Sequence, residues 1–514
     1  MKVNQLKAGV IISYLQMALS VLISLLYTPV MLKLLGDSEY GLYNTVASTV
    51  SMLAILSLGL NSGYVRYFSQ YRQRNEKERI YSLNGLYFIV LSVIGIIALL
   101  CGAFLTCNLD LVFKDGLTHS EYETARILMI ILTANLSLSF PMGVFSNIIS
   151  AHERFVFLRL LSVIKTVASP LVTLPLMLIG FRSIGVVTVT LIFSVLTDAL
   201  YMYYVFFVLK DRFVFRNFEK GLFRSIFSYT AFIALNMIID QINNNLGKVI
   251  IARYLGTVQV AVYSVGFTLY SYYLTFSSTV SAIFTPRVHK IVNEFQHDKK
   301  LLCEKQTDLF IKVGRIQYFI LALISTGFIF FGMDFITKLW ISKAGYEDAF
   351  YVTVMLMIPV TIPLIQNVGI EMQRAQNKHK FRSIVYLFMA LINVAVSVIL
   401  CRRFGIIGCT VGTSVSFVLF NGVILNIYYQ KRCYINVLRF WKSILLASRS
   451  LILPIVFGII MTNIFRSFSI TGFICRILAY SAVYCLSVWL FGLNEREKQL
   501  LLTPFKKIFK RQGN

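Results

Sequence analysis

Stretches of about twenty mostly apolar residues recur from one end of the chain to the other. A membrane-crossing helix needs about that many residues, because only a helix or a closed barrel satisfies its own peptide groups in hydrocarbon. Of the 514 residues, 57% are hydrophobic and 14% are charged, whereas soluble domains carry about 25% charged residues. The pattern predicts an all-α membrane protein with about fourteen transmembrane helices. The expected spans are residues 8–32, 41–65, 81–105, 125–149, 156–179, 184–209, 226–251, 258–284, 309–332, 348–371, 381–401, 405–429, 446–466 and 471–492.

The distribution of basic residues indicates how the chain is oriented. The net charge of +26 comes from 49 Lys and Arg against 23 Asp and Glu. If residue 1 is cytoplasmic, the inside segments hold 35 of the basic residues and the outside connections hold 11. Since cytoplasmic loops are enriched in Lys and Arg, we expect both termini to be cytoplasmic. We expect no nucleic-acid partner, because the charge is spread over eight segments and does not form one basic face.

The chain resembles itself at an offset of about 220 residues, an interval of six helices. The matched segments are MLKLLGDSEYGLYNT from Met31 with IARYLGTVQVAVYSV from Ile251, SAHERF from Ser150 with RAQNKHKF from Arg374, and GFRSIG from Gly180 with RFGIIG from Arg403. Repeats of this kind are typical of transporters with a midplane site between the halves. We therefore expect two pseudo-symmetric six-helix lobes at residues 1–210 and 211–440. Residues 441–514 should form two additional helices and a basic cytoplasmic tail.

Four segments, in order along most of the chain, resemble the polysaccharide flippases. These are the Wzx-like branch of the multidrug, oligosaccharidyl-lipid and polysaccharide exporter superfamily. The segments are LLGDSEYGLYNT (Leu34 to Thr45), LGLNSGYVRYFSQY (Leu58 to Tyr71), ARYLGTVQVAVYSVG (Ala252 to Gly266) and IFTPRVHKI (Ile283 to Ile291). Each motif alone is loose, and their order and spacing make the resemblance specific.

The resemblance implies a two-lobed, V-shaped transporter that alternates between inward-open and outward-open states. Its implied cargo is an undecaprenyl-diphosphate-linked oligosaccharide, moved from the cytoplasmic to the outer leaflet of the bacterial inner (plasma) membrane. The product would be lipopolysaccharide O-antigen, capsule or exopolysaccharide. Besides the lipid bilayer, the implied partners are a glycan polymerase and chain-length proteins, and the last two helices would accommodate the lipid tail.

Motifs for catalysis, nucleotide hydrolysis and metal binding are missing from the sequence. There is no GxxxxGKS/T loop, since Gly247-Lys248 precedes Val249 and lacks the earlier glycine, and there is no HExxH. We expect no enzymatic activity, no metal and no cofactor. Energy would come from an ion gradient, the membrane potential or consumption of the product outside.

The strongest local signal is the seventh span, IIDQINNNLGKVII, where Asp240, Asn244 and Lys248 recur every four residues on one helix face. A diphosphate-sugar cargo needs donors for phosphate oxygens and amides for hydroxyls, and this face offers both. Ionisable groups at membrane depth are costly to keep, which favours a cargo site. The alternative is that Asp240 and Lys248 pair with neighbouring residues and fasten the lobes.

Further candidate cargo contacts lie in other spans. Lys165 and Asp198, in spans five and six, either form a salt bridge or serve as a phosphate-binding cation and a carboxylate for H⁺ or Na⁺. Asp240 is the second candidate for ion coupling. Arg66, at the end of span two, either contacts cargo or extends to the membrane interface. Tyr270 and Tyr273, in the hydroxyl-rich span eight, either stack on sugar rings or form a packed tyrosine belt.

Two rival functions remain open. The first is a multidrug or small-cation antiporter of the same superfamily; the +26 charge and two additional helices favour an anionic, lipid-tailed cargo instead. The second is a membrane-embedded glycan polymerase or ligase. Such enzymes usually need a large outside loop, and the longest outside stretch is residues 106–124. The sequence does not specify the glycan, the coupling ion or the oligomeric state.

Overall fold

The computed structural model describes residues 5–499 except 58, 114–116, 217, 220, 296, 377, 465–468 and 496. Within these residues every regular element is helical. The main helices are α1 (Gln5–Leu35), α2 (Asp37–Met52), α3 (Leu60–Gln73), α4 (Lys77–Cys107), α5 (His119–Ala151), α6 (Phe155–Leu176), α7 (Arg182–Tyr203), α8 (Leu222–Leu255), α9 (Thr257–Phe295), α10 (Lys299–Asp334), α11 (Glu347–Ile365), α12 (Asn367–Ala375), α13 (His379–Phe417), α14 (Leu425–Arg432), α15 (Val437–Ser448), α16 (Ile452–Ile464) and α17 (Ile470–Ser487).

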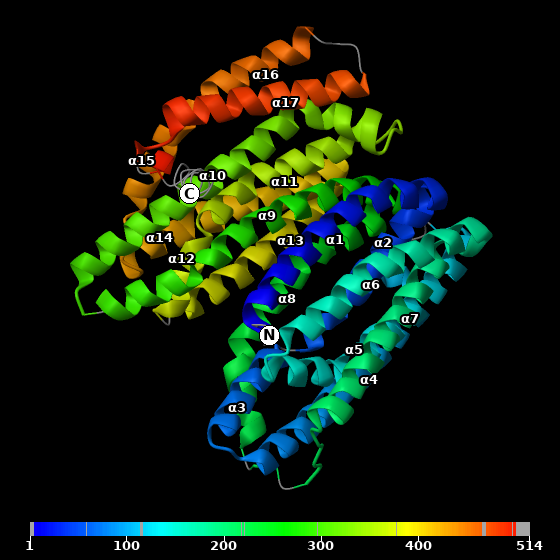
Figure 1. Ribbon diagram of the computed structural model, residues 1–514. Helices are drawn as coiled ribbons and strands as arrows, with labels where there is room; N and C mark the ends of the chain where they lie inside the picture. Colours follow the sequence, from blue (N-terminus) through cyan, green and yellow to red (C-terminus); the bar gives the residue numbers. More distant parts are fainter. Residues whose placement is uncertain are drawn as a thin grey trace, which may run out of the picture. The chain divides into compact units, whose positions relative to one another are not determined.

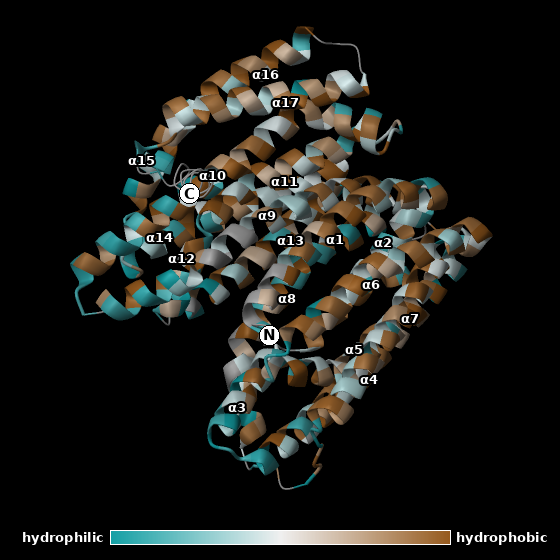
Figure 2. Cartoon of the chain, viewed as in Figure 1, coloured by the Kyte–Doolittle hydropathy of each residue, from teal (hydrophilic) through white to brown (hydrophobic). Residues whose placement is uncertain are grey.

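Ten stretches of the described residues are helical, long and apolar enough to cross a membrane. The count rises to eleven if the two segments of α8, bent by 49° relative to each other, form one span. Hydrophobic residues cover most of the helices, and hydrophilic residues gather near their ends and in the connections (Figure 2). The prediction of an all-helical, multi-pass membrane protein is thereby confirmed. The count of fourteen and the cytoplasmic termini stay predictions.

Residue contacts divide the chain into two compact units. The first comprises Met1–Val265 and Tyr386–Gly412, and the second comprises Gly266–Val385 and Thr413–Asn514. Helices α9 and α13 therefore contribute residues to both units. The predicted division into lobes ending at residues 210 and 440 stays a prediction.

In the first unit, α5 packs against α4 and α7, and α6 packs against α1 (Figure 1). Small residues on α4 make the contact with α5 close. A Cβ added at Gly102 would lie 2.1 Å from the Thr133 side chain, and one added at Gly95 would lie 2.6 Å from the Ser137 carbonyl oxygen. Glycine at such positions lets the backbones of two membrane helices approach each other.

The beginnings of α2 and α7 are joined by a half-buried carboxylate. Glu39 Oε1 accepts hydrogen bonds from Ser183 N at 2.9 Å and Ser183 Oγ at 2.6 Å. Its other oxygen, Oε2, lies 3.2 Å from Arg182 Nη1. Two of the matched sequence segments, one from Met31 and one from Gly180, therefore meet at this point.

Two glycines with nearly the same backbone conformation precede α2 and α9. Gly36 has φ 80° and ψ 172°, and Gly256 has φ 86° and ψ 174°. L-residues rarely adopt this region, so glycine lets one helix end and the next begin within a single residue. The two positions are 220 residues apart, which is the offset of the sequence comparison.

In the second unit, α10 packs against α11, α15, α16 and α17, while α16 and α17 lie side by side (Figure 1). The most buried charged contact of this unit in the described residues involves Arg315 on α10, which is 4% exposed. Its Nε and Nη2 donate to the two carboxylate oxygens of Glu497 at 2.8 and 2.9 Å. Nη2 also donates to the Gly492 carbonyl at 2.6 Å, and Nη1 to the Ser443 carbonyl at 3.2 Å. This arginine attaches the segment after α17 to α10.

Candidate functional site

The α8 face predicted to contact cargo lies in the first unit. Asp240 and Asn244 are exposed, and Lys248 is half-buried. At 1.5 Å rise per residue, the three side chains extend over about 12 Å of helix. The face thus presents a carboxylate, an amide and an ammonium group along one line, as the spacing predicts.

Other amides of α8 join it to α13 within the same unit. Asn393 Nδ2 donates to Asn243 Oδ1 at 3.1 Å, and Ser397 Oγ donates to Asn393 Oδ1 at 2.9 Å. On α8 itself, Asn245 Nδ2 donates to Gln241 Oε1 at 2.6 Å. Of the three consecutive asparagines, Asn243 and Asn245 are engaged in these bonds. The structure therefore gives part of this polar run a role in helix packing.

Lys165 and Asp198 lie on adjacent helices, α6 and α7, and interact electrostatically. The Lys165 ammonium donates to Ser194 Oγ at 2.9 Å. Ser194 lies four residues before Asp198 on α7, so Asp198 belongs to the same helix face. Both charged side chains are half-buried. The arrangement fits a structural pair, and it also fits a cation beside a carboxylate that could exchange a proton or a sodium ion.

The remaining candidates lie apart from these groups in the chain. Arg66 is an exposed residue of α3 in the first unit. Tyr270 and Tyr273 belong to the second unit and are 4% and 1% exposed. The Tyr273 hydroxyl lies 2.6 Å from Thr361 Oγ1. This burial favours packing for Tyr273 in the present structure, and a role in cargo binding stays a prediction for all three residues.

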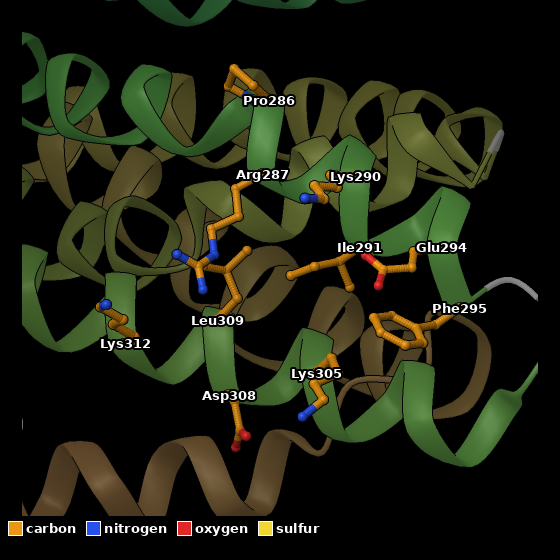
Figure 3. Close-up of a pocket in the computed structure, with 10 residues that line it drawn as sticks. All are labelled: Pro286, Arg287, Lys290, Ile291, Glu294, Phe295, Lys305, Asp308, Leu309 and Lys312. Carbon is orange, nitrogen blue, oxygen red and sulfur yellow. The ribbon is translucent and has the colours of Figure 1, made fainter.

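The sequence interpretation missed a basic pocket between α9 and α10 of the second unit. Its volume is about 770 Å³, and its basic lining residues are Arg287, Lys290, Lys305 and Lys312 (Figure 3). In the sequence these residues contributed only to the inside charge count. Their spacing held a signal, because residues three or seven positions apart share one face of a helix.

Metal-ligating side chains do not gather into a site within the part of the chain that the structure describes. Among the described residues, no group of three or more His, Cys, Asp or Glu side chains could hold a metal ion.

Comparison with known proteins places the chain in a family. Residues 6–291, more than half of the chain, match the family model described as polysaccharide biosynthesis protein. The chain belongs to this polysaccharide biosynthesis protein family. No functionally curated protein matches it in sequence.

Solved structures show the same fold at low sequence identity. The lipid II flippase MurJ, in an inward closed conformation, is 14% identical with a TM-score of 0.66, covering 97% of this chain and 99% of MurJ. A multidrug resistance MATE family transporter of the MOP superfamily, in an inward-facing conformation, is 14% identical with a TM-score of 0.60, covering 80% of this chain and 94% of the transporter. A MATE transporter of Vibrio cholerae is 12% identical with a TM-score of 0.54, covering 84% of this chain and 98% of its own.

These likenesses show that this member of the polysaccharide biosynthesis protein family has the fold of the MurJ and MATE transporters. The resemblance inferred from four sequence motifs is thereby confirmed for the family and the fold.

Proposed function

We propose that this protein is a flippase for an undecaprenyl-diphosphate-linked oligosaccharide. It would move the lipid-linked repeat unit from the cytoplasmic to the outer leaflet of a bacterial inner membrane by alternating access. The match of residues 6–291 to the polysaccharide biosynthesis family carries the proposal. The fold shared with a lipid II flippase over 97% of the chain supports it. We infer transport and no catalysis for the same reasons.

The rival multidrug antiporter is supported by the likeness to MATE transporters. The alignments with two of them include 94% and 98% of the transporters but only 80% and 84% of this chain. The alignment with the lipid II flippase includes 97% of this chain. Coverage of nearly the whole chain therefore favours a lipid-linked cargo.

Deletion of the gene in its native host, followed by analysis of lipid-linked intermediates, tests the cargo. Undecaprenyl-linked repeat units should accumulate with their sugars on the cytoplasmic side, and surface polysaccharide should fall. Normal polysaccharide with increased sensitivity to cationic drugs would overturn the flippase proposal in favour of the antiporter.

We further propose fourteen crossings with both termini in the cytoplasm, arranged as six, six and two. Two candidate stretches, Phe155–Leu209 and Lys380–Arg432, contain 55 and 53 residues. A single helix of that length would span about 80 Å, far beyond the roughly 30 Å hydrocarbon core. Each is interrupted by a non-helical glycine, Gly180 or Gly405. Counting each stretch as two crossings, and α8 and α9 as one each, gives fourteen.

Cysteine labelling tests this orientation. Cys107, the last residue of α4, is exposed, and Cys303 near the start of α10 is half-buried. In single-cysteine variants, a membrane-impermeant maleimide should label Cys107 in intact cells and Cys303 only in inverted vesicles. The reverse pattern would overturn the orientation.

For the α8 face we propose contact with the diphosphate-sugar group of the cargo. Asp240→Asn and Lys248→Ala should each reduce glycan export at least tenfold in a complementation assay, at normal protein levels. Arg224→Gln provides a matched control, because Arg224 is exposed in the first turn of the same helix. Wild-type export by both α8-face variants would remove this face from the cargo site.

A further inference from the structure

A pocket of about 770 Å³ lies between the end of α9 and the beginning of α10, within the second unit. Helix α9 contributes Arg287, Lys290 and Glu294 to its lining. In Figure 3 the Arg287 side chain extends from α9 toward α10. The volume is within the range of small-molecule sites, about 300–1,000 Å³.

Four cations line this pocket, and none of them has an ion-pair partner within the described residues. They are Arg287, Lys290, Lys305 and Lys312. Of the two carboxylates in the lining, Asp308 is bound by Arg439 at 3.0 Å, which offsets its charge. The second carboxylate in the lining is that of Glu294, a single negative charge beside the four cations. The pocket therefore has a strong excess of positive charge.

Like charges that line one cavity repel each other, and a bound anion would relieve this repulsion. Arginine offers a planar fork of donors that matches phosphate oxygens, and lysine offers a point charge. The cations stand on both helices: Arg287 and Lys290 on α9, and Lys305 and Lys312 on α10. A ligand with two linked phosphates would offer one phosphate to the cations of each helix.

The pocket is also partly apolar. Pro286, Ile291, Phe295 and Leu309 line it beside the cations. An inorganic ion would leave these side chains unused, whereas the first carbons of a lipid or prenyl chain would cover them. The combination indicates a phosphate-bearing amphiphile.

We propose that the α9–α10 pocket binds a diphosphate group. Two sources carry paired phosphates: the prenyl diphosphate of the cargo, and the headgroup of the anionic phospholipid cardiolipin. The existence of the site does not depend on the proposed flippase function. Only the assignment of its ligand to the cargo rests on that function.

Binding of inorganic pyrophosphate to the purified full-length protein in detergent tests the site by calorimetry. Arg287→Gln with Lys290→Gln should raise the dissociation constant about tenfold, the size expected for losing two exposed phosphate–cation contacts. Lys305→Gln with Lys312→Gln should do the same from the other helix. The control is Lys299→Gln with Lys300→Gln, since both lysines are exposed on α10 and do not line the pocket.

The proposal requires that both lining pairs weaken binding and that the control pair does not. Absence of pyrophosphate binding to the wild-type protein, or equal weakening by all three pairs, would overturn it. Normal elution on gel filtration shows that a variant is folded. If one lining pair does not fold, the other carries the test.

The source is identified with the same variants in nanodiscs. Loss of affinity for undecaprenyl diphosphate alone assigns the site to cargo, and loss of affinity for cardiolipin alone assigns it to the membrane. Either result supports a phosphate site. Unchanged affinity for both lipids would overturn the proposal. Because the pyrophosphate measurement involves no transport, it stands even if gene deletion overturns the flippase proposal.

Discussion

Removing either member of the Arg315–Glu497 pair should destabilise the protein by about 3–5 kcal/mol, the usual effect of leaving a buried charge without its partner. The side chains of the two residues are 4% and 13% exposed, so solvent screens the interaction little. Arg315→Met leaves the Glu497 carboxylate without its two charged donors and the Gly492 carbonyl without a hydrogen bond. Glu497→Leu leaves a guanidinium buried beside two backbone carbonyls.

The double variant separates this pairwise effect from general disruption. Arg315→Met with Glu497→Leu removes both charges, and apolar replacement of a buried ion pair is often neutral. We therefore expect the double variant to be more stable than either single variant, with a coupling energy of about 2 kcal/mol or more. At about 2 °C per kcal/mol, each single variant should lower Tm by about 6–10 °C.

Thermal unfolding of the purified protein in detergent, followed by tryptophan fluorescence, provides the measurement. The matched control is Arg439→Gln in the same unit. Arg439 pairs with Asp308 at 3.0 Å, but the two side chains are 55% and 48% exposed, and such pairs contribute at most about 1 kcal/mol. The reasoning fails if Arg315→Met lowers Tm no more than the control does, or if the two single losses add in the double variant.

Two further predictions concern the Cys433 thiol and the Glu39 carboxylate. Burial raises the pKa of the Cys433 thiol to about 11. At pH 8 the thiol is therefore rarely ionised, although a thiolate of higher pKa is a better nucleophile, and the two effects together should make its alkylation about 20-fold slower than that of an ordinary thiol. The rate should rise as the pH increases. Mass spectrometry of single-cysteine variants would contradict this if Cys433 and Cys303 reacted equally fast at pH 8. Glu39→Ala should cost about 1–3 kcal/mol, because Ser183 N and Oγ, within a residue that is 0% exposed, lose their acceptor. The isosteric Glu39→Gln retains an acceptor oxygen and should be milder, and equal losses of Tm in the two variants would refute this role.

The sequence predicted those features that depend on local properties. Hydropathy identified the membrane helices, since each crossing must be apolar over its own length. The repeat identified Gly36 and Gly256 as equivalent, and both adopt the same unusual conformation before a helix. The i, i+4, i+8 spacing placed Asp240 and Lys248 on one face because helix geometry is fixed.

Features that depend on distant partners were not predictable. Arg315 binds Glu497, 182 residues away, and no spacing rule connects these positions. The burial of Tyr273 depends on neighbours such as Thr361 on another helix. The basic pocket requires that α9 and α10 face each other, whereas the sequence presents its four cations only as part of a charge count.

The backbone conformation of Gly36 is one that a D-residue adopts more readily than an L-residue. Beyond the adjacent residues of the chain, no atom lies within 4 Å of a Cβ added to Gly36 or Gly256, whereas a Cβ at Gly41 would lie 1.8 Å from the Thr257 carbonyl oxygen. The first two glycines are therefore required by handedness and the third by volume. D-alanine introduced by chemical synthesis or semisynthesis would adopt the backbone conformation of Gly36 without strain, because φ 80° and ψ 172° mirror the extended region of L-residues. At Gly41 an L side chain would displace the neighbouring backbone.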